Sequence, residues 1–296
     1  MIRSLIENNQ DEFEIYVLCM DEETKQILKK INMQSVHLFD LAVVEDFIPK
    51  LREVKKTRTA AEYCWTLSSS FSIYLFDHIQ HIDLLTYLDA DLYFYEDTQA
   101  IFDEMGAASI SIIEHRFSDE FIKYEVNGKF CVEWVSFRRN AEGLACLNKW
   151  HHQCVEWCYA RQEEGKFGDQ KYLDEWPDLY PTCHIIRNLG AGIAPWNYKK
   201  YTINYLDRDK KIKIDGFPLI FYHFHQFKIF KNNKYIRMPK VYESQENFFD
   251  EIYELYEMGV VESISQIKKF NPNFSHGVMD GYHKTLIKGY FLEKFS

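Results

Sequence analysis

Short apolar runs with strand character alternate with helical periodicity along the first two-thirds of the chain. The strand-like runs lie at residues 14–20, 36–39, 82–88, 108–113, 130–137 and 184–187. Apolar residues at helical spacing lie at residues 25–31, 59–79 and 143–161. Strands that alternate with helices in this way predict an α/β chain with a mainly parallel, doubly wound sheet.

Nothing in the sequence divides the chain internally, since it has no repeat, low-complexity run or linker rich in Gly, Pro or Ser. We expect one domain over residues 1–240, with an aromatic hairpin at 217–230 and a helical appendage at 241–296 that opens with a helix over 244–259. A doubly wound domain normally opens with a strand, whereas residues 2–7 resemble the end of a helix. Two readings of this first strand are open: translation starts upstream of Met1, or the protein does without it.

The charge and hydropathy of the chain limit its possible binding partners and its cellular location. The formal net charge of -10 repels a phosphodiester backbone, so nucleic acid is not expected as a partner. The chain has no run as apolar as a membrane span and no apolar leader at its start, which predicts a cytoplasmic protein. The acidic segment 244–262 and the aromatic residues 290–295 are expected to pack on the domain, with peripheral contact to the membrane as the alternative.

The seven cysteines are scattered and odd in number, which indicates reduced thiols of a cytosolic protein. Cys154 and Cys158 lie one helical turn apart beside His151 and His152, a spacing that a metal site also uses. Because no second cysteine pair completes a zinc motif, a packed helix face is the preferred interpretation.

The most informative motif is the run LTYLDADLYF at residues 85–94. Asp89 and Asp91 follow a buried strand at spacing i and i+2, so on extended backbone both carboxylates point to the same side. Open α/β sheets place their ligands at the carboxyl ends of such strands. Paired carboxylates there suit Mg²⁺ or Mn²⁺, with substrate phosphates completing the coordination. An ordinary exposed turn is the alternative.

The segment YLDADLYF at residues 87–94 resembles the Asp-x-Asp strand of GT-A glycosyltransferases. From residue 58 to residue 227 the chain is similar to family 8, which includes glycogenin and bacterial lipopolysaccharide galactosyltransferases, and to related nucleotide-diphospho-sugar transferases. The resemblance implies a GT-A fold and metal-dependent transfer of a sugar in polysaccharide synthesis. It also implies a nucleotide-sugar donor, expected to be UDP-linked, and a glycan or lipid-linked acceptor.

The resemblance extends to FYHFHQF at residues 221–227. It implies that His223 is the third metal ligand and that His225 and Gln226 lie near the diphosphate or the acceptor. Ala90, between the two carboxylates, is expected to contact the donor. The alternative is an aromatic strand whose histidines are hydrogen bonded to backbone carbonyls.

The segment GDQKYLDEWP at residues 168–177 resembles the Asp-Gln helix start of the same families. In that comparison Gln170 lies beneath the anomeric carbon and Asp169 belongs to the catalytic group, which implies a retaining enzyme with front-face attack. Asp169 is alternatively a helix cap. A nucleophilic Asp or Glu is the competing mechanism.

Two further segments match more loosely. Arg58 and Glu62 lie four residues apart at the start of the long helix, and the resemblance implies that Arg58 contacts the donor. A surface ion pair is the alternative. Trp196 and Asn197 follow a glycine-rich turn and resemble the substrate-binding loop of these transferases, although a core-anchoring Trp is equally compatible with the sequence.

The chain departs from the family at residues 131–133, where Cys-Val-Glu replaces an Asn-x-Gly pattern that admits the sugar. This departure makes a catalytically degenerate, donor-binding or scaffold protein one rival interpretation. A nucleotidyltransferase is the other, but it would need a Gly-rich basic loop after the first strand, which the sequence lacks.

Overall fold

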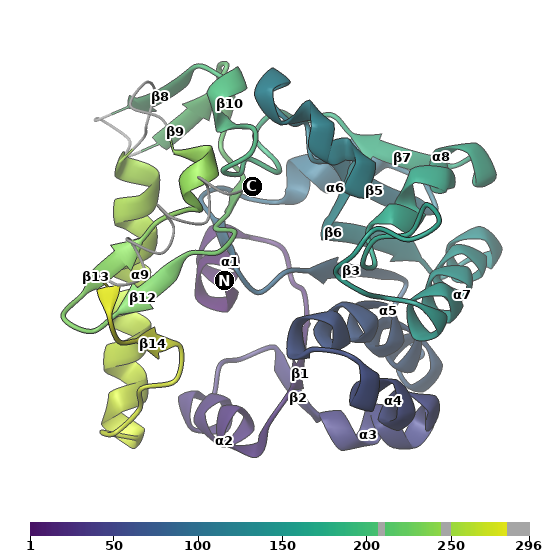
Figure 1. Cartoon of the computed structure of the whole chain (residues 1–296), viewed down its shortest axis with the longest axis horizontal. Coiled ribbons are helices and arrows are strands. Elements are labelled where there is room, and N and C mark those ends of the chain that lie inside the picture. Colours follow the sequence, from purple (N-terminus) through teal and green to yellow (C-terminus); the bar gives the residue numbers. More distant parts are fainter. Residues whose placement is uncertain (207–210, 244–249, 283–296) are drawn as a thin grey trace.

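The computed structural model of the chain describes residues 1–206, 211–243 and 250–282 (Figure 1). The α-helices in this part of the chain are α1 (Ile2–Asn8), α2 (Glu22–Ile31), α3 (Leu41–Phe47), α4 (Lys50–Val54), α5 (Ala60–His78), α6 (Gln99–Met105), α7 (Ala141–Glu156), α8 (Trp176–Leu179) and α9 (Asp250–Phe270). Short 3₁₀ helices are η1 (Lys55–Thr57), η2 (Asp119–Asn127), η3 (Lys171–Glu175), η4 (Tyr198–Lys200) and η5 (Lys240–Tyr242).

The strands are β1 (Ile15–Cys19), β2 (Val36–Asp40), β3 (Leu84–Leu88), β4 (Leu92–Phe94), β5 (Ile110–Glu114), β6 (Phe130–Arg138), β7 (Cys183–Ile186), β8 (Ile203–Leu206), β9 (Lys211–Ile214), β10 (Phe217–Pro218), β11 (Phe221–His223), β12 (Lys228–Phe230), β13 (Lys234–Ile236) and β14 (Val278–Met279). The central sheet has the order β3-β6-β5-β7, and β1 with β2 forms a separate two-stranded sheet. Smaller sheets pair β11 with β4, β8 with β9 and β10, and β12 with β13 and β14.

The expected α/β architecture is confirmed, and strand directions refine it. The pairs β1–β2 and β5–β7 are parallel, as expected, whereas β6 runs antiparallel to both β3 and β5. Strand β6 is buried on both faces from Phe130 to Phe137, and its sequence is an apolar run, interrupted only by Glu133 and Ser136, that carries no signal of direction. The sheet is therefore mixed around its central strand.

Helix α5 carries the clearest local signals. Thr59 caps it, and Glu62 completes a capping box by accepting the Thr59 N–H at 2.7 Å. Helix α7 packs against α5 beside the central sheet (Figure 1). It ends at Glu156, five residues before the expected end, because Ala160 N–H donates to Glu62 and Val155 O accepts from Arg58. These contacts draw the chain out of helical geometry.

Several aromatic residues of the last third pack into one cluster. Tyr222 and Phe224 contact Tyr253 of α9, and the Tyr222 and Tyr253 hydroxyls are 2.9 Å apart. The expected helix at 244–259 corresponds to α9, which begins at Asp250; residues 244–249 and the aromatic residues 290–295 lie outside the described residues. Among the described residues, every helix is too short or too polar to span a membrane.

Candidate metal centre

Strand β3 delivers two carboxylates to its carboxyl end, where the chain turns. Asp89 follows the strand directly, and Ala90 with Asp91 forms a turn before β4. The expectation of extended backbone here is wrong, because Leu92 N–H reaches back to Asp89 O at 3.4 Å. Phe224 N–H donates to Asp91 O at 2.9 Å and braces the turn. The two carboxylates are thus brought together by a turn and not by strand alternation.

His223, the last residue of β11, faces this turn. It is opposite Leu92 in the antiparallel β11–β4 pair, and its side chain is 6% exposed. Its Nε2 lies 3.0 Å from Asp91 Oδ1 and 3.9 Å from Asp89 Oδ2. The structure therefore brings together the three predicted ligands, whose donor atoms all lie within 4.8 Å of one another.

The donor set fits a small divalent cation. Octahedral coordination of Mg²⁺ at about 2.1 Å places neighbouring ligand atoms about 3.0 Å apart, which is the spacing between His223 and Asp91. Carboxylate oxygens and a neutral imidazole are ligands that Mn²⁺ and Mg²⁺ sites use. The side chains of Asp89 and Asp91 are 29% and 43% exposed, so the ligand atoms remain open to an incoming phosphate.

The electrostatics of this group reflect its burial and its mixed charge. Burial raises the pKa of Asp89 to about 6, and His223 opposes that shift. Burial also acts to raise the pKa of Asp91, but the facing His223 outweighs it and the pKa ends below its ordinary value. For His223, burial acts to lower the pKa, yet Asp91 and the hydrogen bonds hold it well above the ordinary value. Without a cation, His223 thus serves as the positive charge between the carboxylates.

Glu133 holds the opposite side of the imidazole. Its side chain is 1% exposed, and His223 Nδ1 donates to its Oε2 at 2.6 Å. Glu133 lies in an irregular part of β6, where the residues paired with Ile112 and Ile113 are Val135 and Cys131. Such irregularities re-aim side chains at functional sites. From the sequence, Glu133 belonged only to the departure from the family pattern at residues 131–133, and this contact was not predicted, although a lone carboxylate in an apolar strand demands a buried partner.

A second group of possible ligands shares His223. Cys131, Glu133 and His223 also place their donor atoms within 4.8 Å, and all three residues are buried. The 2.6 Å between His223 Nδ1 and Glu133 Oε2 leaves no space for an ion with ligand bonds of about 2 Å on each side. The Nε2 side, with its two aspartates, is therefore the side that fits a cation.

The glycine-rich turn before Trp196 packs directly against Glu133. Gly192 has φ +69°, and a Cβ atom there would lie 2.5 Å from Ile113 Cδ1 and 2.8 Å from Glu133 Oε1. At Gly190 a Cβ atom would lie 1.8 Å from Pro218 O. The sequence predicts a flexible turn here, whereas the structure shows glycines required by close packing.

The two predicted substrate residues after this turn, Trp196 and Asn197, are both buried. Trp196 packs edge to face on His223 and His225 at ring distances of 5.2 and 5.4 Å. Asn197 is fully buried; its Nδ2 donates to His115 O and Gly192 O, and its Oδ1 accepts from Ala194 N–H. The structure thus gives Asn197 a loop-holding role.

His225 and Gln226 lie just beyond β11. Burial, followed by the charge of His223, lowers the pKa of His225 to about 4, so His225 is neutral at physiological pH. Gln226 is exposed in a left-handed turn at φ +57°, and Ala90 is exposed between the aspartates. The residues that remain accessible at this rim are therefore Ala90, His225 and Gln226.

Asp169 and Gln170 connect α5 with the end of the central sheet. Asp169 is 5% exposed and accepts from Ser68 Oγ at 3.1 Å. Burial, and then the charge of Asp89, raises the pKa of Asp169 to about 8. The alternative role of Asp169 as a helix cap is wrong, since η3 begins after Gln170. Gln170 Nε2 donates to Asn127 O at 3.0 Å, and no described residue donates to its Oε1.

Arg58 and Glu62 are buried and do not form the surface ion pair considered above. Arg58 donates to Thr66 Oγ1 and to Val155 O, the latter at 2.8 Å, while Glu62 caps α5 and accepts from Ala160 N–H at 2.8 Å. These contacts join the start of α5 to the end of α7. A donor contact by Arg58 stays a prediction.

The fold and the site define an α/β protein with a carboxylate–imidazole candidate metal centre at the carboxyl end of β3, an edge strand of the central sheet. Two proteins of Bacillus subtilis (strain 168) resemble this chain along nearly its whole length. Uncharacterized protein YfnF is 32% identical over 282 residues, which cover 93% of this chain and 91% of YfnF. Uncharacterized protein YfnD is 31% identical over 280 residues, which cover 94% of this chain and 88% of YfnD. The chain belongs to the family of YfnF and YfnD.

No protein-family model matches the chain. Three solved structures overlap with it loosely. Mouse xyloside xylosyltransferase 1 has a TM-score of 0.46 at 14% identity and covers 76% of this chain and 90% of its own. Galactosyltransferase LgtC, solved with donor and acceptor sugar analogs, has a TM-score of 0.48 at 14% sequence identity. The match covers 88% of this chain and 89% of the LgtC chain. The bifunctional glycosyltransferase WbbM has a TM-score of 0.47 at 13% sequence identity. The match covers 89% of this chain and 48% of the WbbM chain.

Proposed function

We propose that this chain is a glycosyltransferase that binds a nucleotide-sugar through one Mn²⁺ or Mg²⁺ ion held by Asp89, Asp91 and His223. The observation that carries the proposal is the convergence of His223 Nε2 with both carboxylates at the carboxyl end of β3. The motif resemblance at residues 87–94 and 221–227 supports the same assignment. A UDP-linked donor and a glycan or lipid-linked acceptor complete the proposal, with the protein in the cytoplasm or at the cytoplasmic face of the membrane.

The bound cation would neutralise negative charge on the departing nucleoside diphosphate. The protein's own part is to present two partly exposed carboxylates and one buried imidazole in a fixed arrangement. Glu133 accepts the Nδ1 proton of His223 and so leaves Nε2 as the ligand atom. Trp196 packs edge to face against the imidazole of His223 and restricts its rotation. These contacts preorganise the site before the donor arrives.

Gln170 is the residue we assign to the reacting carbon. Asn127 O anchors its Nε2, so Oε1 is the atom able to face an electron-poor sugar carbon. The neighbouring Asp169 is buried, and its pKa near 8 keeps it protonated at neutral pH, which makes it a poor nucleophile. This combination favours front-face attack with retention over a covalent glycosyl–aspartate.

The proposal is tested by donor hydrolysis, which needs no knowledge of the acceptor. The full chain is incubated with a panel of nucleotide-sugars and Mn²⁺, and the released nucleoside diphosphate is measured. We expect hydrolysis of a UDP-sugar that chelation abolishes and that Asp91→Asn removes, while Asp178→Asn, at an exposed position on α8, keeps it. Absence of hydrolysis together with absence of Mn²⁺-dependent stabilisation by any nucleoside diphosphate would overturn the proposal. Stabilisation without hydrolysis would instead indicate a donor-binding protein.

A further inference from the structure

The side chain of Tyr87 contacts one of the two carboxylate oxygens of Asp89. The Tyr87 hydroxyl lies 2.9 Å from Asp89 Oδ1, which is a normal hydrogen-bond length between two oxygens. A phenol keeps its proton at neutral pH and an ionised carboxylate can only accept, so Tyr87 is the donor. Oδ1 of this predicted metal ligand therefore already has a partner within the protein.

The pairing of β3 with β6 fixes the direction of both side chains. Tyr87 is opposite Val135 in the antiparallel ladder. Asp89 continues the ladder just beyond the strand, because its N–H donates to Glu133 O at 3.3 Å. Side chains two positions apart on extended backbone point to the same face, so the ring of Tyr87 and the carboxylate of Asp89 lie side by side.

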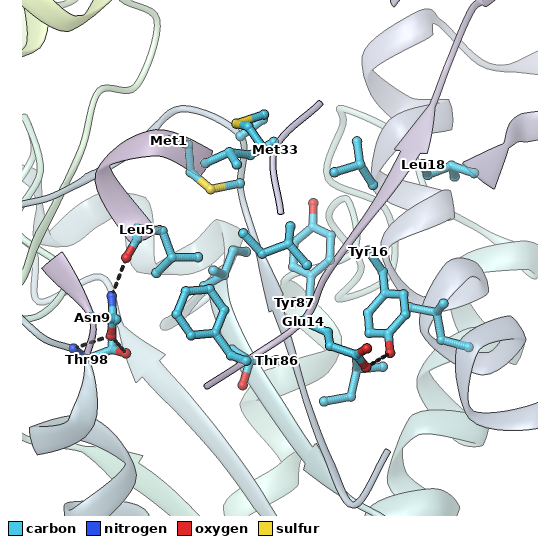
Figure 2. A pocket seen from close by; sticks show the side chains of 18 of the residues that line it. Met1, Leu5, Asn9, Glu14, Tyr16, Leu18, Met33, Thr86, Tyr87 and Thr98 are labelled. Carbon is cyan, nitrogen blue, oxygen red and sulfur yellow. Dashed lines mark hydrogen bonds between the residues drawn. The ribbon is translucent and has the colours of Figure 1, made fainter. Parts of the chain in front are cut away.

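The ring of Tyr87 is held by its neighbours in the fold. It is half-buried and packs against the core cluster that contains Leu75 and Leu85. Figure 2 shows Tyr87 on the wall of a cavity of about 1030 Å³, whose lining also includes Ala90 of the turn between the two aspartates. Because a packed ring carries its hydroxyl at a defined point, the hydrogen bond restricts the orientation of the Asp89 carboxylate.

The second oxygen of Asp89 faces the candidate metal centre. Asp89 Oδ2 lies 3.9 Å from His223 Nε2, and Asp91 presents Oδ1 to the same nitrogen at 3.0 Å. A hydrogen bond to Asp89 Oδ1 withdraws negative charge from that oxygen and leaves Oδ2 as the better ligand. Asp89 is thus arranged to bind a cation through one oxygen.

The number of oxygens that a carboxylate offers matters for the choice of cation. Ca²⁺ takes about six to eight oxygen ligands and often binds a carboxylate through both of its oxygens. Mg²⁺ takes about six ligands in a near-ideal octahedron and needs no such chelation. A carboxylate limited to one oxygen therefore removes a ligand that Ca²⁺ would use, while it leaves the smaller ion unaffected.

We propose that Tyr87 is a positioning residue that restricts Asp89 to one metal-binding oxygen and thereby favours Mn²⁺ and Mg²⁺ over Ca²⁺. This inference rests on the proposed function, since it requires a cation at Asp89, Asp91 and His223. Two of the three ligands then have a dedicated hydrogen-bond partner, because Glu133 orients the imidazole and Tyr87 orients the carboxylate.

The test is Tyr87→Phe in the full chain, which removes the hydroxyl and keeps the ring. The Kd for Mn²⁺ is measured by titration of the free-Mn²⁺ EPR signal, and the Kd for Ca²⁺ by displacement of bound Mn²⁺. We expect Tyr87→Phe to raise the Kd for Mn²⁺ by about tenfold or more and to leave the Kd for Ca²⁺ unchanged or lower. The ratio of the Ca²⁺ Kd to the Mn²⁺ Kd should therefore fall by about tenfold or more.

The matched control is Tyr95→Phe. The Tyr95 hydroxyl donates to Ile252 O at 2.8 Å, so this substitution removes a hydrogen bond of similar length from the same kind of donor but spares both aspartates. It should leave both dissociation constants unchanged. A crystal structure of the wild-type chain with Mn²⁺ provides a check that needs no substitution. Asp89 should bind the ion through Oδ2 alone, with Oδ1 still on the Tyr87 hydroxyl.

Three outcomes would overturn this inference and leave the proposed function intact. The first is an unchanged Kd for both ions in Tyr87→Phe. The second is an equal rise in both dissociation constants, which would make Tyr87 a structural support without influence on the choice of cation. The third is Mn²⁺ bound by both oxygens of Asp89 in the wild-type crystal. Failure of the wild-type chain to bind Mn²⁺ at all would instead overturn the proposed metal site, and this inference with it.

Discussion

His223 Nδ1 donates to Glu133 Oε2 at 2.6 Å, while His223 Nε2 faces Asp91 Oδ1 at 3.0 Å. One buried imidazole therefore links a fully buried carboxylate of the central strand to the carboxylates of the exposed turn. Hydrogen bonds of this kind fix the tautomer and the ring orientation of a metal-binding histidine.

Replacing Glu133 with Gln should weaken metal binding without unfolding the protein. The amide oxygen still accepts the Nδ1 proton, but the negative charge that raises the basicity of the ligand is lost. We expect the Kd for Mn²⁺ to rise by about 10–100-fold, measured by titration of the free-Mn²⁺ EPR signal. Glu254→Gln, at an exposed position on α9, should leave the Kd unchanged. An unchanged Kd in Glu133→Gln would show that Glu133 does not support the metal ligand.

Gly192→Ala should destabilise the fold more than Gly165→Ala. Both glycines have positive φ, at +69° and +76°, so both substitutions incur the backbone cost of about 1 kcal/mol. At Gly192 the new Cβ also collides with Ile113 and Glu133, while at Gly165 nothing lies within 4 Å. We expect a further loss of about 1–3 kcal/mol at Gly192, measured by urea unfolding. Equal losses would mean that the close contact at Gly192 relaxes freely.

Asn197→Ala should lower the free energy of unfolding. The substitution removes both donors and the acceptor of a fully buried amide and leaves His115 O, Gly192 O and Ala194 N–H without that partner. We expect a loss of about 2 kcal/mol or more in the free energy of unfolding. The control is Asn148→Ala on the exposed side of α7, where the change should be within about 0.5 kcal/mol. A stable Asn197→Ala protein with weakened donor binding would instead favour the substrate contact predicted from the sequence.

Asp169 should make the metal-free protein less stable as the pH rises from 6 to 8. Its folded pKa of about 8 is above the unfolded value, so the native state retains a proton that the unfolded state has released. The contribution of Asp169 is full below the unfolded pKa and falls by about 1.4 kcal/mol per pH unit until the pH reaches the folded pKa. Asp169→Asn should remove this slope in urea unfolding with chelator present. A wild-type slope that persists in Asp169→Asn would assign it to another group.

Much of the architecture could be predicted from local sequence. The strands at β1, β2, β3 and β6 and the helix α5 lie where periodicity and capping residues place them, within a few residues. Strand direction could not be predicted, because the buried run of β6 is equally suited to either direction. The early end of α7 also depends on contacts from Arg58 and Glu62, about a hundred positions away along the chain.

The candidate site was predictable where a motif encodes it. The grouping of Asp89, Asp91 and His223 follows from two motifs about 130 residues apart, which only the family resemblance connects. The contact of Glu133 with His223 was not predicted, because the two residues lie 90 positions apart in the sequence. The turn at Ala90 entered only as the alternative to extended backbone, since spacing i and i+2 suits a strand and a turn alike.

In the proposed function, Asp89, Asp91 and His223 hold one divalent cation. The most direct measurement is an anomalous difference map, recorded near the manganese edge, from crystals of the full chain soaked with Mn²⁺ and UDP. We predict one peak within about 2.3 Å of His223 Nε2 and of an oxygen from each aspartate, with diphosphate oxygens completing the coordination. A map with manganese bound elsewhere, or with the diphosphate seated away from this turn, would contradict the account.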